Sequence, residues 1–344
     1  MLNFEQFQEY VSDHIKEFLP EELQSANVEL NSVNKNNGRE LHAILVRPEG
    51  CSVAPTVYLD GFYEGYEDGA SLDSVMKDIA DTSAKNQSPE EFANIAEDYR
   101  NLDFVKDRIV MAVVNAEKNQ EMLQETPHKM KEDLAVIYKV MIGADAHGLA
   151  SIIVKQPHMD TWGIDVDQLH DYAMKNSNRL LPATVQSMDE IMRDMMSNSG
   201  MPEEMLEEMM EDMAGREPDE QMWVITNSEK INGAAGIIYS DALEQLSEKL
   251  GSDLFILPSS IHEVIAVSTN LGDPEMLASM VHEVNEGQVA LDEQLSDHVY
   301  HFDAMTHNLS LADTSVEQLQ AMVGEQSETY DAPTQNNSGP KHHR

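Results

Sequence analysis

The stretch "GSDLFILPSSIHEVIAVS", Gly251–Ser268, decides the fold, because it contains two apolar runs on either side of a short polar break. This pattern predicts β-strands at 253–259 and 262–268. Successive side chains of a strand face opposite sides of a sheet, so His262 and Glu263 are expected to point in opposite directions. A zinc-protease helix is excluded, since position 266 is Ala266 where that motif needs a second histidine.

In the rest of the chain, segments whose apolar residues have the spacing of a strand are interspersed with segments that have the spacing of a helix. Asn-Gly pairs predict hairpins in 28–47, through Asn37-Gly38, and in 222–240, through Asn232-Gly233. The segment "GFYEGYEDG", 61–69, is expected to be a connecting loop. Other strands are expected at 55–60, 104–115, 133–142, 148–155 and 297–303. Helices are expected at 3–23, 71–84, 89–100, 117–124, 165–182, 241–251 and 273–286.

This order of elements predicts an α+β fold with largely antiparallel or mixed sheets and packed helices. The chain is expected to divide into an N-terminal α+β region at 1–183, a methionine-rich helical insertion at 184–220 and a C-terminal α+β region at 221–312. The polar tail at 313–344 is expected to be disordered.

The formal net charge of −41 on 344 residues disfavours direct nucleic-acid binding, which depends on neutralising phosphates with lysine and arginine. The start of the chain lacks the basic and apolar regions of a signal peptide, and no run is apolar enough to span a membrane. The single Cys51 excludes internal disulfides and a multi-cysteine metal site. We therefore expect a cytoplasmic protein, and no cofactor is predicted.

The insertion carries a dense methionine pattern among carboxylates in 188–215. Methionine side chains adapt to several partner shapes, so this segment is a candidate docking surface for a protein partner. The alternative is that its methionine face folds back onto the body of the same chain.

The candidate catalytic residues are His262, Glu263 and Asp253. A carboxylate among aliphatic side chains has its pKa raised by desolvation, which is how general acids are made. An enzyme of unfamiliar type, hydrolase-like, would have its cleft beside Pro258–Glu263. In that cleft His262 or Glu263 would meet a second polar group such as Asp253, Asp107 or His128.

The remaining motifs are weaker. His301 and Asp303 share one face of the expected strand and are weak candidate metal ligands, but a solvated strand face explains them better, so no metal site is predicted. Lys106, Asp107 and Arg108 begin an apolar strand and are read as ion-pairing residues at a strand end. A Walker loop, a dinucleotide-binding glycine fingerprint and a nucleophile elbow around Ser259 are all missing.

Seven blocks, in order, carry a family resemblance. They are "NNGRELHAILVRPEG", "PTVYLDGFYEGYEDG", "VKDRIVMAVVNAEKNQEML", "PHKMKEDLAVIY", "WGIDVDQLHDYAMKNSNRLLP", "LGSDLFILPSSIHEVIAV" and "LSDHVYHFD". Together they resemble a bacterial domain-of-unknown-function family, number five-six-eight-eight, found in anaerobes and on mobile elements. The likeness covers 3–303, and the methionine-rich stretch departs from the family's short connection. The resemblance implies no established activity, so it transfers no catalytic residue.

These observations favour a non-catalytic accessory or interaction protein that engages a protein partner through its acidic surface and the segment 188–215. The hydrolase-like enzyme is one alternative. The other is a DNA mimic that inhibits a DNA-binding protein, because a carboxylate array can imitate phosphates.

Overall fold

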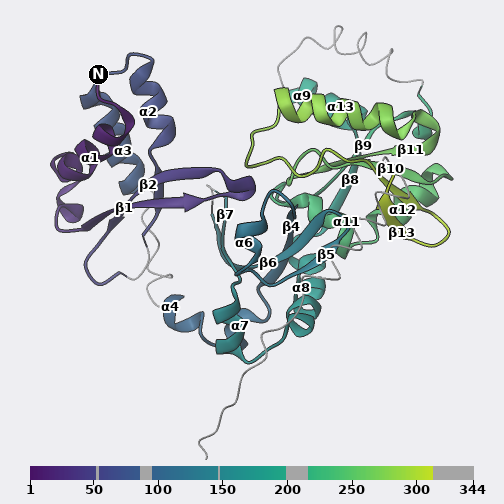
Figure 1. Cartoon of the computed structure of the whole chain (residues 1–344), viewed down its shortest axis with the longest axis horizontal. Coiled ribbons are helices and arrows are strands. Elements are labelled where there is room, and N and C mark those ends of the chain that lie inside the picture. Colours follow the sequence, from purple (N-terminus) through teal and green to yellow (C-terminus); the bar gives the residue numbers. More distant parts are fainter. Residues whose placement is uncertain (52–53, 86–94, 146–147, 199–215, 313–344) are drawn as a thin grey trace, which may run out of the picture.

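The computed structural model describes residues 1–51, 54–85, 95–145, 148–198 and 216–312. It contains three antiparallel sheets with helices packed around them, which confirms the α+β prediction (Figure 1). None of the helices in these ranges has the length and apolar character needed to cross a membrane. The segments 199–215 and 313–344 lie outside the described residues, as does the first half of the helix expected at 89–100.

The first sheet forms the N-terminal part of the molecule, drawn in purple in Figure 1. Its strands are β1 (Asn27–Asn34), β2 (Glu40–Arg47) and β3 (Thr56–Tyr58). The turn between β1 and β2 places Asn37 at φ +58 and Gly38 at φ +70, as the Asn-Gly signal predicts. The β1–β2 hairpin is therefore confirmed.

Three helices cover this sheet and share a core with it. They are α1 (Phe4–His14), α2 (Asp60–Glu67) and α3 (Leu72–Lys85). The expected helix at 3–23 is shorter than predicted, because α1 passes into short 3-10 turns at Ile15–Glu17 and Glu21–Leu23 on either side of Pro20.

The expected loop at 61–69 is also wrong, because most of it is α2. Its Tyr63 and Tyr66 rings pack on Phe7, with centroid separations of 5.3 and 5.8 Å. Aromatic packing thus holds the segment in a helix despite its glycines.

The second sheet is built around the long strand β6. Its strands are β4 (Ile109–Asn115), β5 (His128–Lys131), β6 (Leu134–Asp145) and β7 (Gly148–Ile153). β6 pairs with all three others, and its register with β7 shifts between Met141 and Gly143. One face of the sheet is covered by α8 (Val166–Leu180), which α7 (Gln156–Trp162) precedes in the chain.

The third sheet has the strand order β13-β12-β10-β11-β9-β8. Its bounds are β8 (Ala183–Ser187), β9 (Trp223–Asn227), β10 (Leu254–Leu257), β11 (Val264–Ser268), β12 (Tyr300–Asp303) and β13 (Asn308–Leu311). One face joins the core of the second sheet, while Phe255 and Val267 on the other face pack against Leu277 and Val281 of α13 (Pro274–Gly287). Figure 1 draws α9 (Met188–Asn198) and α13 on the same side of this sheet.

The predicted hairpin through Asn232-Gly233 is wrong. After β9 the chain enters a 3-10 turn, Gly233–Ala235, and the short helix α11 (Gly236–Tyr239). β9 instead pairs with β8 and β11. The remaining helices are α4 (Ile95–Asp98), α5 (Leu102–Val105), α6 (Gln120–Leu123) and α12 (Ala242–Leu250).

A segment without regular structure, Leu291–Ser296, ties the three sheets together, and we call it the 291–296 hub. The side chain of Asn37, at the tip of the β1–β2 hairpin, donates to the carbonyls of Leu291 and Gln294 at 2.7 Å each. Arg39 adds an ion pair to Asp292 at 2.5 Å.

On its other side the hub meets a buried carboxylate of the second sheet. Ser296 Oγ donates to Asp133 Oδ2 at 2.7 Å, and the Tyr300 hydroxyl of β12 donates to Asp133 Oδ1. Burial and the nearby carboxylate raise the pKa of the Tyr300 hydroxyl well above its ordinary value, so it keeps its proton and remains a donor. Asp133 therefore links the β5–β6 turn to the third sheet.

Replacing Tyr300 by Phe is expected to lower the free energy of unfolding by about 2 kcal/mol, because a buried carboxylate oxygen loses its donor. Urea denaturation measures the change. Tyr10→Phe is the matched control, since the Tyr10 ring packs against the N-terminal core and His14, and the phenylalanine ring can keep both contacts. Equal stability of the two variants would show that the Tyr300–Asp133 contact does not hold the sheets.

Candidate functional site

His262 and Glu263 lie in the loop between β10 and β11, so the predicted strand at 262–268 is wrong at its first two residues. The cause is a second chain that pairs with this loop. Ile261 N–H donates to Glu293 O at 2.8 Å, and Leu295 N–H donates to Ser259 O at 3.1 Å. The 291–296 hub thus holds the loop in place of an extended β10–β11 ladder.

The His262 imidazole has two polar neighbours. Asn232 N–H donates to Nδ1 at 3.3 Å, and Glu293 Oε1 lies 3.7 Å from Nε2. An Nδ1 that accepts a hydrogen bond leaves the ring proton of the neutral imidazole on Nε2, toward Glu293. Among the described residues, the polar contacts of the His262 ring do not include the predicted partners Asp253, Asp107 and His128.

A lysine that the sequence reading missed completes this cluster. Lys139 lies on β6, and its Nζ donates to Asn232 Oδ1 at 3.0 Å. Burial of the ammonium, with a smaller contribution from nearby Lys35, lowers the pKa of Lys139 to about 8. An amine with such a pKa can act as a base or nucleophile.

Geometry limits what this Lys139–Asn232–His262 cluster can do. Neither of the two described cavities is lined by Lys139, His262 or Glu263. The sequence signal for Lys139 was its position as a single charge inside the apolar run "LAVIYKVMI", 134–142. The cluster is therefore a polar contact between the second and third sheets, and it lines neither of these cavities.

The turn that carries Asn232 is tightly packed. Asn232 has φ +53, and a Cβ added to Gly233 would lie 2.5 Å from the carbonyl oxygen of His262 and 2.8 Å from the amide nitrogen of Asn227. Thr226 Oγ1, which donates to that same carbonyl at 2.7 Å, would also clash. Only glycine fits this position, which fixes the distance between Asn232 and His262.

The candidate metal ligands His301 and Asp303 do not share a site. His301 Nε2 lies 3.1 Å from Asp253 Oδ2. Asp303 instead accepts from the amides of Met305 and Thr306, and the Thr306 hydrogen bonds lower the pKa of its carboxyl group. Within the described ranges, no group of three or more His, Cys, Asp or Glu side chains could hold a metal ion.

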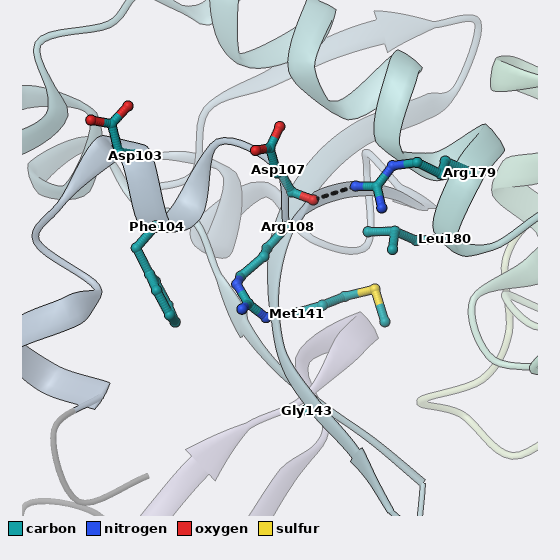
Figure 2. A pocket seen from close by; sticks show the side chains of 8 residues that line it. All are labelled: Asp103, Phe104, Asp107, Arg108, Met141, Gly143, Arg179 and Leu180. Carbon is teal, nitrogen blue, oxygen red and sulfur yellow. Dashed lines mark hydrogen bonds between the residues drawn. The ribbon is translucent and has the colours of Figure 1, made fainter. Parts of the chain in front are cut away.

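Of the predicted catalytic residues, Asp253 lines a cavity. This cavity, of about 280 Å³, lies between α12 and the β12–β13 turn. The cavity wall holds one His–carboxylate pair, because His307 Nδ1 lies 2.9 Å from Glu244 Oε1, whereas the His301 partner of Asp253 is not a lining residue. A larger cavity of about 530 Å³ includes Asp107 and lies at the start of β4 (Figure 2).

An exposed apolar stripe runs along α13. Met276, Met280 and Val284 are 55%, 45% and 42% exposed, at a spacing of four residues that places them on one side of the helix. The exposed carboxylates Glu275, Glu283 and Glu286 follow the same helix. We call these six residues the α13 face.

Helix α9 shows the same combination. Met192 and Met195 are 38% and 68% exposed, while Asp194 and Glu190 are also exposed. The helix belongs to the segment 188–215, which the sequence predicts to be a docking surface. The rest of that segment, 199–215, lies outside the described residues. Sequence periodicity placed α13 but could not show which of its apolar residues face solvent.

Comparison with known proteins gives one match. A model described as a family of unknown function, DUF5688, matches residues 4–304. No curated protein and no solved structure matches the chain.

Replacing Lys139 by Met is expected to raise the free energy of unfolding at pH 7 by up to about 3 kcal/mol, because a desolvated ammonium is removed. The folded pKa of Lys139 lies below its unfolded value. Between pH 8 and 10.5 the unfolded chain therefore binds the proton that the folded chain has released, and wild-type stability rises with pH.

The advantage of Lys139→Met should thus shrink across that window in chemical denaturation. Lys77→Met removes an exposed ammonium, 2.5 Å from Asp73, and is the control with a constant difference from wild type. A difference for Lys139→Met that does not vary with pH would contradict the lowered pKa.

Replacing Gly233 by Ala is expected to lower the free energy of unfolding by about 1–3 kcal/mol, since the added Cβ must displace backbone. Gly236→Ala is the control on the same turn, because its added Cβ would meet ordinary contacts at 3.5 Å in a helix. Thermal denaturation of both variants tests this. Equal melting temperatures would refute the packing argument.

Proposed function

The chain belongs to the family of unknown function DUF5688, whose model covers residues 4–304, and we propose that it is an interaction protein that binds a basic amphipathic helix of a protein partner. The observation that carries this proposal is the exposed stripe Met276, Met280 and Val284 on the α13 face.

The stripe is supported by a rigid base. Leu277 and Val281, on the adjoining side of α13, are buried against Phe255 and Val267 of the third sheet. The helix therefore cannot turn to bury its methionines without losing that core. Apolar side chains repeated at a helical spacing on a fixed element are the pattern of a surface that receives a partner helix.

Charge selects the partner. The face carries Glu275, Glu283 and Glu286 without a lysine or arginine on α13, and the whole chain has a formal charge of −41. This field attracts a cationic helix and repels acidic proteins, nucleic acid and anionic membranes. Methionine side chains can repack around different apolar surfaces, which suits a helix of variable sequence.

Helix α9, which carries the exposed Met192 and Met195, lies on the same side of the third sheet as α13 (Figure 1). This agrees with the docking role proposed for 188–215. A cytoplasmic location and a link to mobile elements remain part of the proposal.

The alternatives have less support. A hydrolase-like cleft beside Pro258–Glu263 needs a cavity at His262, and neither described cavity is lined by it. A DNA mimic is compatible with the net charge of −41, but apolar side chains on the α13 face do not imitate phosphates.

Fluorescence anisotropy with a labelled Leu/Lys amphipathic helix tests the proposal. The double variant Met276→Ser/Met280→Ser keeps the net charge and should weaken binding about tenfold, because two apolar contacts are lost. Met305→Ser removes a methionine on the β12–β13 turn that is 94% exposed, and is the matched control with wild-type affinity. A peptide of the same composition but scrambled order should bind weakly.

Two outcomes would overturn the proposal. Equal peptide affinity of wild type and the double variant would remove the stripe from binding. Tighter peptide binding after deletion of 199–215 would assign the α13 face to the chain's own methionine-rich segment instead of a partner.

A further inference from the structure

The larger cavity lies at one end of the second sheet, beside the helices α5 and α8, and Figure 2 shows it from close by. It is bordered by α5 and the start of β4, by the last turn of α8, and by β6 at its register shift with β7. Its lining residues are Asp103, Phe104, Asp107, Arg108, Met141, Gly143, Arg179 and Leu180.

Arg108 has no acidic partner among the residues that the structure describes, and a ring holds it instead. Its guanidinium lies over the Phe104 ring, with 4.5 Å from Cζ to the ring centroid. Figure 2 shows both side chains extending in the same direction, while the carboxylates of Asp103 and Asp107 point the opposite way. Stacking occupies the flat face of the guanidinium and leaves the N–H groups at its edge available to a ligand.

Arg179 approaches the same cavity from the last turn of α8. Its Nη2 donates to the carbonyl oxygen of Asp107 at 2.7 Å and to Asn176 Oδ1 at 3.4 Å. These acceptors are uncharged and orient the guanidinium without neutralising it. The Asp103 carboxylate, for its part, is neutralised by Lys106 Nζ at 2.6 Å.

The cavity brings together two arginines that have no ion pair among the described residues. Acidic residues outnumber Lys and Arg by 63 to 22, and Arg39, Arg47 and Arg216 each form an ion pair with a carboxylate. Within the part of the chain that the structure describes, Arg100, Arg108, Arg179 and Arg193 form none, and of these four Arg108 and Arg179 line the same cavity. Two unneutralised guanidiniums on one hollow, in so acidic a protein, indicate a place for an anion.

We propose that this cavity binds a small organic monocarboxylate, with its carboxylate between Arg108 and Arg179 and its apolar part against Phe104, Met141 and Leu180. Arg108, Arg179 and the adjoining Lys106, set against Asp103 and Asp107, give this region a net charge of about +1, which matches a monoanion. A dianion such as a phosphate monoester, or a polyanion, would be repelled by the surrounding negative field. The cavity volume of about 530 Å³ accommodates a ligand of this size.

Isothermal titration calorimetry of the full chain with benzoate, and with neutral benzamide, tests the assignment. Benzoate should bind and benzamide should bind at least about tenfold more weakly, because the guanidiniums recognise charge. Arg108→Gln and Arg179→Gln should each weaken benzoate binding about tenfold. Arg100→Gln changes an exposed arginine outside the cavity and should bind like wild type.

Phe104→Leu separates the role of the ring from that of the charge, since it should weaken benzoate binding while leaving the preference over benzamide. Circular dichroism confirms that each variant is folded. No benzoate binding at millimolar concentration, equal affinity for benzamide, or unchanged affinity in Arg108→Gln and Arg179→Gln would overturn the proposal. Displacement of benzoate by an equal concentration of inorganic phosphate would overturn the choice of a monoanion.

Discussion

The buried carboxylate of Asp133 is the constraint on which the rest of the structure depends. Moving a carboxylate out of water costs several kcal/mol unless donors replace its hydration. Here the donors are the hydroxyls of Tyr300 and Ser296, with a longer hydrogen bond of 3.4 Å from the Asn115 amide of the second sheet itself. The two hydroxyls are the donors that join the sheets. Both belong to the C-terminal part of the chain, so satisfying Asp133 fixes the second sheet against the third. Ser296 is also the end of the 291–296 hub, whose backbone holds the loop of His262 and whose start receives the tip of the β1–β2 hairpin. Together with the contacts of the hub, this buried carboxylate links all three sheets.

The elements that could be predicted from sequence are those whose signals are local. The helix α13 begins at the cap Asp273 with Pro274 in its first turn, and α12 ends at Gly251 with φ +65. The pair Asn37-Gly38 makes its hairpin, but Asn232-Gly233 does not. The dipeptides are the same. The second is held in a 3-10 turn because Gly233 packs against the backbone of His262 and Asn227. His262 is distant in the sequence, and Asn227 is held by the pairing of β9 with β8.

The candidate sites were less predictable, because they depend on contacts between residues that are distant in the sequence. The position of His262 depends on pairing with Glu293 and Leu295, and nothing near His262 in the sequence signals that partner. Arg108 and Arg179 lie in different elements, and only the packing of α8 on β4 brings them to one cavity. Lys139 is the exception, because a single lysine inside an apolar strand is visible in the sequence as a buried charge.

The two proposed surfaces require ligands of opposite charge, so the net charge of −41 attracts one ligand and repels the other. A basic helix is drawn to the α13 face by the field of the whole molecule, so its association should be fast and sensitive to salt. A small carboxylate must reach Arg108 and Arg179 against that field, and its affinity must come from short-range hydrogen bonds and the Phe104 ring. Because Arg108 and Arg179 lie beside the second sheet and the methionines lie on the third, occupation of one surface leaves the other open. Bound helix would reduce the negative field, and so the two ligands should favour each other rather than compete.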